Sequence, residues 1–312
     1  MKFYKPKFWD NRSQISLFSI LLLPVSLIVI IKNYFESNKI KRNFYDLKTI
    51  CVGNIYVGGT GKTPLVNNLA SHFKKKFKTY VIKKNYTSHL DEKKLLELKH
   101  KVIFEKTRLL SLSKAEQKKA ELVIFDDGLQ EKMINYDLKI VCFNSLKLDG
   151  NGLVIPAGPL RESLKSVKDY DIVLINGKIT KETRYFIDKI KGINPNIKIF
   201  TGRYVPKNYN NLKKKKFLIF SGIGNPHTFY ETLKSLKIKF NEYKKFPDHY
   251  NYNESDLLKL KESAKINGCE LLTTEKDYLR IKKSFRKNVN FLKVDLLIDQ
   301  QKKFYKYLNE KL

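Results

Sequence analysis

A glycine-rich stretch at residues 57–66, "VGGTGKTPLV", follows an apolar run that is typical of a β-strand. Its glycines let backbone N–H groups turn inward around phosphate oxygens, and the N-terminus of the next helix adds its dipole. In such a loop Lys62 reaches the β- and γ-phosphates, and the Thr63 hydroxyl binds Mg²⁺. The stretch therefore predicts a site for the phosphates of ATP together with Mg²⁺.

The loop departs from the usual G-x-x-x-x-G-K-[ST] pattern at its first glycine, where this chain has Tyr56. Pro64 is compatible with a helix that begins here, because the first turn of a helix does not need its N–H. A chance glycine turn is the alternative. The preceding strand and the intact core "GGTGKT" favour the phosphate loop.

A phosphate loop needs a carboxylate for its metal, and "ELVIFDDGLQ" supplies Asp126 and Asp127 after four apolar residues. The carboxyl ends of parallel strands border the ligand crevice of an α/β sheet, so this pair is expected to face the nucleotide. Asp and Gly also favour simple turns, which is the alternative for this pair taken alone. With the loop upstream, the pair predicts a metal site.

These motifs do not indicate which group accepts the phosphoryl. Water as acceptor would indicate a switch or motor ATPase, whereas an organic hydroxyl would indicate a kinase with a base outside the loop. Asp91 and His249 are candidates for that base. Simpler alternatives remain, because Asp91 could supply charge at a helix N-terminus and His249 could be an ordinary loop residue.

Short apolar runs that alternate with helical stretches must position these residues. Such runs are typical of parallel strands covered on both faces, so we expect an α/β protein with a P-loop NTPase-like parallel sheet flanked by helices. The expected strands are "TICVGNI", "TYVIKK", "ELVIFDD", "LKIVCF", "DIVLING" and "IKIFTG". A Lys-rich stretch at 207–216 is interpreted as a linker or hinge, and a second, smaller α/β set follows it.

The first 40 residues differ from the rest. The run Ile15–Ile31 carries no charge and would reach about 25 Å as a helix, just short of a typical membrane span. Pro24 is expected to interrupt it, and the flanking aromatic residues and lysines suit the headgroup layer. We favour a membrane anchor, and a buried core helix or a cleaved signal peptide are the alternatives.

Three parts are therefore expected. Residues 1–40 form a membrane-associated segment, residues 41–206 the phosphate-loop domain, and residues 207–312 a second α/β domain.

Composition indicates a globular chain with an extreme charge. Basic residues number 62 against 31 acidic ones, which gives a net charge of +31 over 312 residues. Such a surface favours polyanions such as nucleic acid, anionic lipid or phosphorylated substrates, although the lysines could instead add only solubility. Cys51, Cys142 and Cys269 lie far apart and show neither metal spacing nor a disulfide framework.

Segments along nearly the whole chain resemble the tetraacyldisaccharide 4'-kinase family, which phosphorylates a lipid A precursor. The order of "GGTGKTP", "DDG-x-Q", "PAGPLRE" and "FPDH" is highly specific. The matching segments are "PKFWDNRSQISLFSILLLPVSLI", "VGNIYVGGTGKTP", "DDGLQ", "GNGLVIPAGPLRES", "DIVLINGK", "SGIGNPHTFYETL", "FPDHYNY" and "TTEKDYLRI". The resemblance also explains Tyr56, because phosphate loops of this family commonly lack the first glycine.

The resemblance implies roles residue by residue. Asp126 and Asp127 fall on the family's metal-binding acidic pair, and Glu162 falls on an acidic position near the metal. Asp91 and His249 fall on the Asp and His that are thought to activate the sugar hydroxyl together. The ATP loop comprises Gly58, Gly59, Thr60, Gly61, Lys62 and Thr63.

Three segments depart from the family pattern. The family's "SRGY" is "KKNY" here, at residues 83–86, its "GDEP" is "LDEK" around Asp91, and the His that commonly follows "DDGFQ" is Glu131.

By resemblance we expect ATP- and Mg²⁺-dependent transfer to the 4'-hydroxyl of a tetraacylated disaccharide 1-phosphate. The enzyme would lie at the cytoplasmic face of the inner membrane, against an anionic lipid surface, with no nucleic acid and no obligate protein partner. The main rival is a deviant P-loop ATPase that partitions or loads cargo on DNA. Its loop often carries a second Lys where this chain has Tyr56 and Val57. A nucleotide-binding membrane scaffold without catalysis is a third interpretation.

Overall fold

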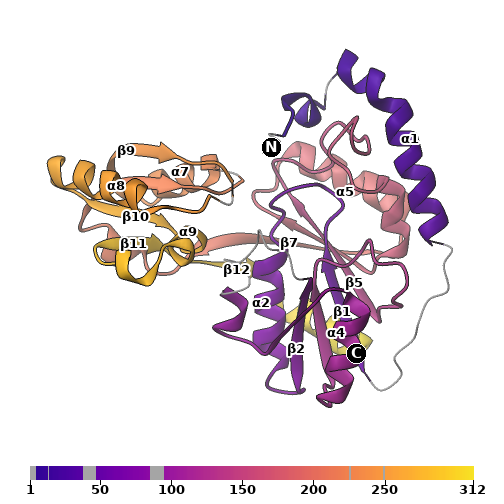
Figure 1. The fold of residues 1–312 in the computed structure, drawn as a ribbon. Coiled ribbons are helices and arrows are strands. Elements are labelled where there is room, and N and C mark those ends of the chain that lie inside the picture. The colour runs from indigo at the N-terminus through magenta and orange to yellow at the C-terminus, as the bar shows by residue number, and fades with distance from the viewer. Residues whose placement is uncertain (1–4, 13, 38–46, 85–94, 225, 249) are drawn as a thin grey trace. The chain divides into compact units, whose positions relative to one another are not determined.

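The computed structural model describes residues 5–12, 14–37, 47–84, 95–224, 226–248 and 250–312 (Figure 1). The chain divides into two compact units. The first comprises Met1–Lys84, His100–Arg203 and Leu296–Leu312, and the second comprises Asn85–Lys99 and Tyr204–Asp295.

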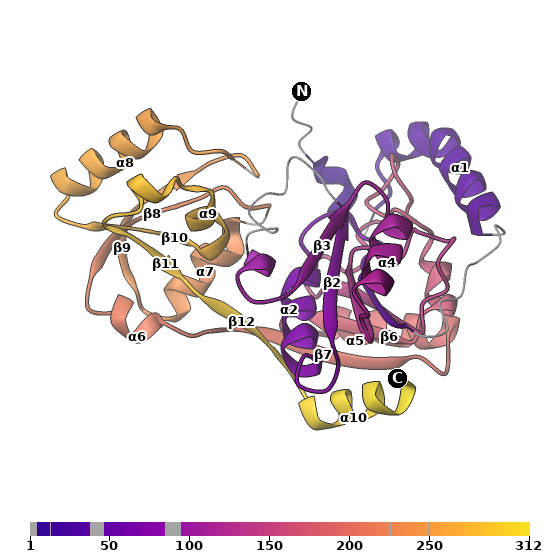
Figure 2. The same ribbon diagram turned by 60° about the horizontal axis from the view of Figure 1, so that its bottom comes forward.

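The first unit is built around an eight-stranded sheet of order β12-β7-β6-β5-β1-β4-β2-β3. The contacts of β1 with β4 and β5, of β2 with β3 and β4, and of β6 with β5 and β7 are parallel. β2 and β3 lie side by side at one edge (Figure 2). The strands are β1 (Lys48–Gly53), β2 (Thr79–Lys84), β3 (Val102–Glu105), β4 (Leu122–Asp126), β5 (Leu138–Asn144), β6 (Ile172–Asn176), β7 (Lys198–Pro206) and β12 (Val294–Ile298).

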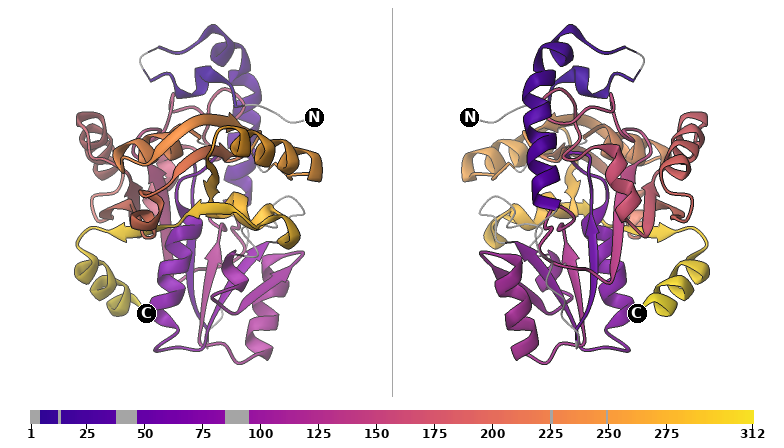
Figure 3. Two further views of the ribbon diagram at one scale, coloured as in Figure 1. Left: turned by 90° about the vertical axis from the view of Figure 1, so that its left-hand side faces the viewer. Right: turned by 90° about the vertical axis from the view of Figure 1, so that its right-hand side faces the viewer.

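Helices cover this sheet and bury its apolar strands. α4 (Arg108–Gln117) and α5 (Lys181–Ile193) share one core cluster with alternate residues of the central strands. α2 (Lys62–Phe73) packs beside α10 (Gln301–Lys311), where the rings of His72 and Tyr305 stack at 3.8 Å (Figure 3). Side chains of Thr107 and Thr180 cap the starts of α4 and α5. The predicted α/β fold with a parallel, helix-flanked sheet is confirmed.

The second unit has its own four-stranded parallel sheet, of order β11-β10-β8-β9. Two separate apolar clusters lie within this unit, and each contains alternate residues of β8. Its strands are β8 (Lys216–Ser221), β9 (Lys239–Lys245), β10 (Glu270–Thr274) and β11 (Val289–Leu292), and its helices are α6 (Tyr209–Leu212), α7 (Pro226–Ser235), α8 (Glu254–Ile266) and α9 (Glu275–Arg280).

Three local expectations differ from the structure. The stretch at 207–216 is not only a linker, because it holds α6 and the first residue of β8. Residues 296–312, expected in the second domain, belong to the first unit instead, since β12 extends its sheet and Phe304 and Leu308 are fully buried. The edge strand β3 was not expected, although three of its four residues, Val102, Ile103 and Phe104, are apolar.

The apolar N-terminal run forms one helix, α1 (Leu17–Ser37), and Pro24 lies inside it rather than interrupting it. The window Leu17–Glu36 has a mean hydropathy of 2.0, and 11% of it is buried. This is a helix long and apolar enough to cross a membrane. Its exposure argues against the buried core helix, because a core helix would hide its apolar side chains.

Candidate active site

The phosphate loop connects the end of β1 to the start of α2, as the motif requires. Gly58 and Gly61 adopt φ angles of 125° and 93°, which favour glycine. Thr60 is buried, and its carbonyl oxygen accepts a 2.6 Å hydrogen bond from Asn176 Nδ2 at the end of β6. A Cβ at Gly59 would meet no heavy atom within 4 Å, so the backbone there is open to a ligand.

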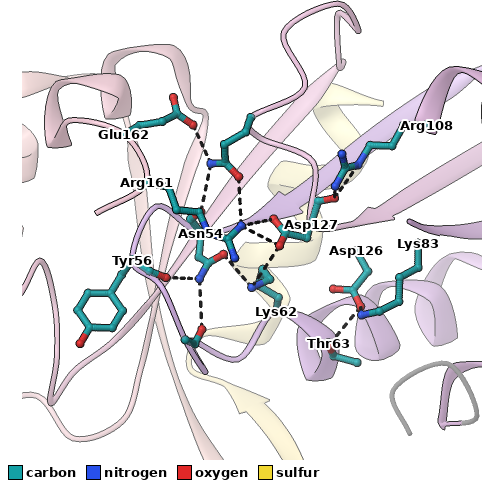
Figure 4. Close-up of polar contacts among 12 residues, drawn as sticks. Asn54, Tyr56, Lys62, Thr63, Lys83, Arg108, Asp126, Asp127, Arg161 and Glu162 are labelled. Carbon is teal, nitrogen blue, oxygen red and sulfur yellow. Dashed lines mark hydrogen bonds and ion pairs between the residues drawn. The ribbon is translucent and has the colours of Figure 1, made fainter. Parts of the chain in front are cut away.

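Asn54, just after β1, braces both the loop and its lysine (Figure 4). Its Oδ1 accepts a 2.7 Å hydrogen bond from Lys62 Nζ, and its Nδ2 donates to the carbonyl oxygens of Tyr56 and Gly58. Asn54 is fully buried. This residue was not predicted from the sequence, although an Asn between an apolar strand and a glycine loop is a signal that could have found it.

Asp126 lies at the end of β4 beside the first turn of α2. Its Oδ2 accepts hydrogen bonds from Thr63 Oγ1 at 3.1 Å and from Lys83 Nζ at 2.5 Å. Its Oδ1 is buried and accepts no hydrogen bond from the residues that the structure describes. Lys83 was noted in the sequence only as a departure, and its contact with Asp126 arises because β2 pairs with β4.

Asp127 has a left-handed backbone, with φ at 70°, which turns its side chain toward different partners. Its carboxylate meets Arg161 Nη1 at 2.9 Å and Lys62 Nζ at 3.8 Å, while Arg108 Nε donates to its carbonyl oxygen at 2.8 Å. Burial acts to raise the pKa of Asp127, but the Lys62 and Arg161 charges outweigh it and hold the pKa below its ordinary value. Asp127 is therefore ionised at neutral pH.

Glu162 is buried but contacts a different set of side chains. Its carboxylate accepts hydrogen bonds from Gln130 Nε2 at 2.7 Å and Lys132 Nζ at 2.8 Å. Gln130 also accepts a 3.3 Å hydrogen bond from Arg161 Nη1, which links Glu162 to Asp127 through two intermediates. Glu162 thus lies in the same polar network as Asp127, and no direct contact between them occurs in the structure.

The segment 150–162 lies between the phosphate loop and α1. Val57 N donates to Pro159 O at 2.9 Å, and Arg161 N donates to Ile55 O at 2.6 Å. From α1, Ser26 Oγ donates to Val154 O at 2.9 Å, and Asn33 Nδ2 donates to Arg161 O at 2.9 Å. The apolar helix is therefore joined to the nucleotide loop through backbone groups of this segment.

The donor set at Thr63 and Asp126 fits Mg²⁺. Mg²⁺ prefers oxygen ligands and is usually held by one or two carboxylates plus substrate phosphates and water. Thr63 and Asp126 offer a hydroxyl and a carboxylate, and the unpartnered, buried Oδ1 of Asp126 is an acceptor that a cation would satisfy. No group of three His, Cys, Asp or Glu side chains suited to a metal occurs within the described ranges.

Two predicted site residues, Asp91 and His249, lie outside the described residues. The structure brings together Lys62, Thr63, Asp126 and Asp127 around one end of the sheet. Asn54, Lys83, Arg108, Arg161 and Asn176 are additional side chains that contact them or the loop.

Comparison with known proteins agrees with the resemblance. A family model described as tetraacyldisaccharide-1-P 4'-kinase (LpxK) matches residues 17–101 and 90–312. The chain is 44% identical over 306 residues to the tetraacyldisaccharide 4'-kinase of Pelagibacter ubique (strain HTCC1062), covering 97% of this chain and 96% of the relative. It is 35% identical over 334 residues to that of Rickettsia akari (strain Hartford), covering 100% and 97%.

A solved structure shares the fold. The crystal structure of LpxK from Aquifex aeolicus in complex with ATP aligns with a TM-score of 0.72 and 24% identity, covering 95% of this chain and 99% of that one. The family model and the relatives confirm the resemblance drawn from the motifs, and the chain belongs to the tetraacyldisaccharide-1-phosphate 4'-kinase family.

Proposed function

We propose that this protein is an ATP-dependent kinase that transfers the γ-phosphate to the 4'-hydroxyl of a tetraacylated disaccharide 1-phosphate, in lipid A biosynthesis. The family match over 17–101 and 90–312 carries this proposal. The relatives at 44% and 35% identity bear the name of that activity, and the Aquifex aeolicus structure is described as an ATP complex. The DNA-directed ATPase is not favoured, because the family model and these relatives bear the name of the kinase.

The phosphate loop would bind ATP and order its phosphates. Backbone N–H groups at Gly58–Gly61 would surround phosphate oxygens, and the Lys62 ammonium would neutralise charge on the γ-phosphate as it is transferred. Asn54 supports this role, since its 2.7 Å hydrogen bond limits where the Lys62 side chain can lie. Holding the charge in place before reaction lowers the barrier, because no reorganisation is needed during transfer.

Mg²⁺, when bound, would supply positive charge that neutralises the negative charge of the nucleotide phosphates. Thr63 and Asp126 would hold it, with Asp127 and Glu162 as further candidates from the family pattern. Asp127 would also position two cations toward the phosphates, because its carboxylate contacts both Lys62 and Arg161.

Asp91 and His249 would activate the sugar hydroxyl. Asp91 would accept the hydroxyl proton, and His249 would assist it by orienting the carboxylate, as the resemblance implies. A base in hydrogen-bond reach of the acceptor is the part of a kinase that the phosphate loop does not provide.

α1 would hold the enzyme at its lipid substrate. Its exposed apolar side chains suit the acyl region, and the net charge of +31 suits an anionic membrane surface. We place the protein at the cytoplasmic face of the inner membrane, where ATP is available, with the lipid disaccharide as its partner. No nucleic acid and no obligate protein partner is expected.

The test is a transfer assay with ATP labelled at the γ-phosphate and purified tetraacyldisaccharide 1-phosphate in mixed micelles. The labelled product is expected to be the 4'-phosphorylated lipid, identified by mass spectrometry. Label released only as inorganic phosphate, with stimulation by DNA, would contradict the proposal.

A further inference from the structure

Lys83 places a positive charge inside the nucleotide site from a neighbouring strand. It lies at the carboxyl end of β2 and pairs in register with Asp126 of β4. Its Nζ lies 2.5 Å from Asp126 Oδ2, and the two side chains are 8% and 0% exposed. An ion pair this enclosed is strongly held, because removing one partner would leave the other charge buried and uncompensated.

The same carboxylate oxygen serves the phosphate loop. Asp126 Oδ2 also accepts the hydrogen bond from Thr63 Oγ1, at 3.1 Å. Thr63 is in the first turn of α2, directly after Lys62. The Lys83 ammonium therefore shares an acceptor atom with the hydroxyl that a phosphate loop uses for its metal.

Positive charges outnumber negative charges in the cluster formed by Lys62, Lys83, Asp126, Asp127 and Arg161. Lys62 and Arg161 both face Asp127, and Lys83 faces Asp126. Among these five side chains, three cations stand against two carboxylates. A cluster with excess positive charge attracts a polyphosphate, and the attraction is strong where protein replaces water.

We propose that Lys83 is a charge-compensating residue of the nucleotide site. It neutralises Asp126, so the triphosphate of ATP binds well without a divalent cation. A divalent cation therefore raises the affinity for ATP less than it would if Asp126 had no compensating charge. The inference rests on the proposed function, because it takes ATP as the ligand of this loop.

The physical reason is the repulsion between like charges. Without the ammonium, Asp126 would repel the phosphates of metal-free ATP and would attract a divalent cation more strongly. A purely structural ion pair behaves differently, since its loss lowers stability and leaves the dependence of ATP binding on metal unchanged.

The experiment is calorimetric titration of the full-length protein in detergent with ATP, once with EDTA and once with excess MgCl₂. The readout is the ratio of the two dissociation constants, EDTA over Mg²⁺. Lys83→Gln, which retains a donor for Asp126, is expected to increase this ratio about tenfold, mainly by weakening binding in EDTA. An increase below threefold overturns the proposal.

Two further variants separate charge from size. Lys83→Arg retains the charge and is expected to leave the ratio within threefold of wild type. Lys114→Met removes another Lys–carboxylate pair of the same unit, with Glu105, and is expected to change nothing. A ratio that rises tenfold in either of these overturns the proposal.

A double variant keeps the test usable if Lys83→Gln does not fold. Lys83→Gln with Asp126→Asn removes both buried charges, and its affinity for ATP in EDTA is expected to stay within threefold of wild type. Tenfold weaker binding by the double variant overturns charge compensation. Wild-type protein that binds ATP in neither condition would overturn the proposed function as well.

Discussion

Arg161 Nη1 lies 2.9 Å from Asp127 Oδ2 and so joins the segment after β5 to the end of β4. Lys62 Nζ approaches the same carboxylate oxygen at 3.8 Å. Asp127 thereby contacts two cations, one of which, Lys62, is the first residue of α2. Its substitution is expected to affect the phosphate site as a unit.

Asp127→Ala and Lys62→Ala are each expected to lower kcat for phosphate transfer by at least about 100-fold, because each removes preorganised charge at the reacting phosphate. The measurement is transfer of labelled phosphate to the lipid disaccharide, with circular dichroism to confirm the fold. Lys114→Ala is the matched control and should retain wild-type turnover. Near-normal turnover of Lys62→Ala would remove that lysine from the site.

Asn54→Ala is expected to weaken ATP binding by roughly 5–150-fold, since it removes the hydrogen bonds that Asn54 makes to two loop carbonyls and to Lys62, at a cost of about 1–3 kcal/mol. Calorimetric titration with ATP and Mg²⁺ measures this change. Asn309→Ala, which removes a side-chain hydrogen bond within α10, is the control. Equal affinities for Asn54→Ala and Asn309→Ala would show that Asn54 does not brace the loop.

The double substitution Leu21→Glu and Ile28→Glu is expected to release the protein from membranes. Both side chains are 67% exposed on α1, and a charge near the bilayer centre costs roughly 2.5–3.5 kcal/mol per residue. The fraction that sediments with anionic vesicles should fall at least about tenfold. Ile266→Glu, at a position 79% exposed on α8, is the control. Undiminished sedimentation would argue against α1 as the anchor.

The Asp127 ion pairs are expected to stabilise the fold in a pH-dependent way. The pKa of Asp127 is lowered in the folded protein, against about 3.9 in the unfolded chain, so its contribution is full above about pH 5 and is lost as pH falls through the folded pKa. The gap in unfolding free energy between wild type and Asp127→Asn should therefore narrow below pH 4. Denaturant unfolding from pH 3 to 8 measures it.

Asp277 serves as a control, because its contribution to stability is expected to depend on pH in the opposite direction. Burial raises its pKa despite the nearby Arg280 charge, so its contribution is greatest at low pH and declines as pH rises through the folded pKa. The difference in unfolding free energy between wild type and Asp277→Asn should therefore decrease as pH rises, whereas the difference for Asp127→Asn increases. Slopes of the same sign for the two Asn variants would contradict one of the two assignments, and the sign would identify which.

Cys269 is expected to react with a thiol reagent in the native protein well before the other two cysteines. Cys51 and Cys142 are fully buried, and burial raises the pKa of Cys142 to about 12 and that of Cys51 further, so neither forms a thiolate near pH 8. Cys269 is half-buried. Cys269→Ser should abolish the rapid native reaction with Ellman's reagent. A native reaction that persists in this variant would show that a buried thiol is reached.

The amino-acid sequence by itself determined the local parts of the site. A strand, a glycine loop and a helix stand consecutively at 48–73, and their backbone angles follow from neighbouring residues. Asp126 and Asp127 were predictable for the same reason, because they end a continuous apolar run. The family could be predicted because several specific motifs occur along the chain in the order typical of that family.

The tertiary structure alone decided which distant residues meet. Lys83 contacts Asp126 because β2 pairs with β4, and Arg161 contacts Asp127 because the segment 150–162 folds beside the loop. Likewise, β12 and α10 return to the first unit, although no change of composition marks that point. The order of strands in a parallel sheet depends on crossovers and on burial summed over the whole core, and no local stretch of sequence encodes either.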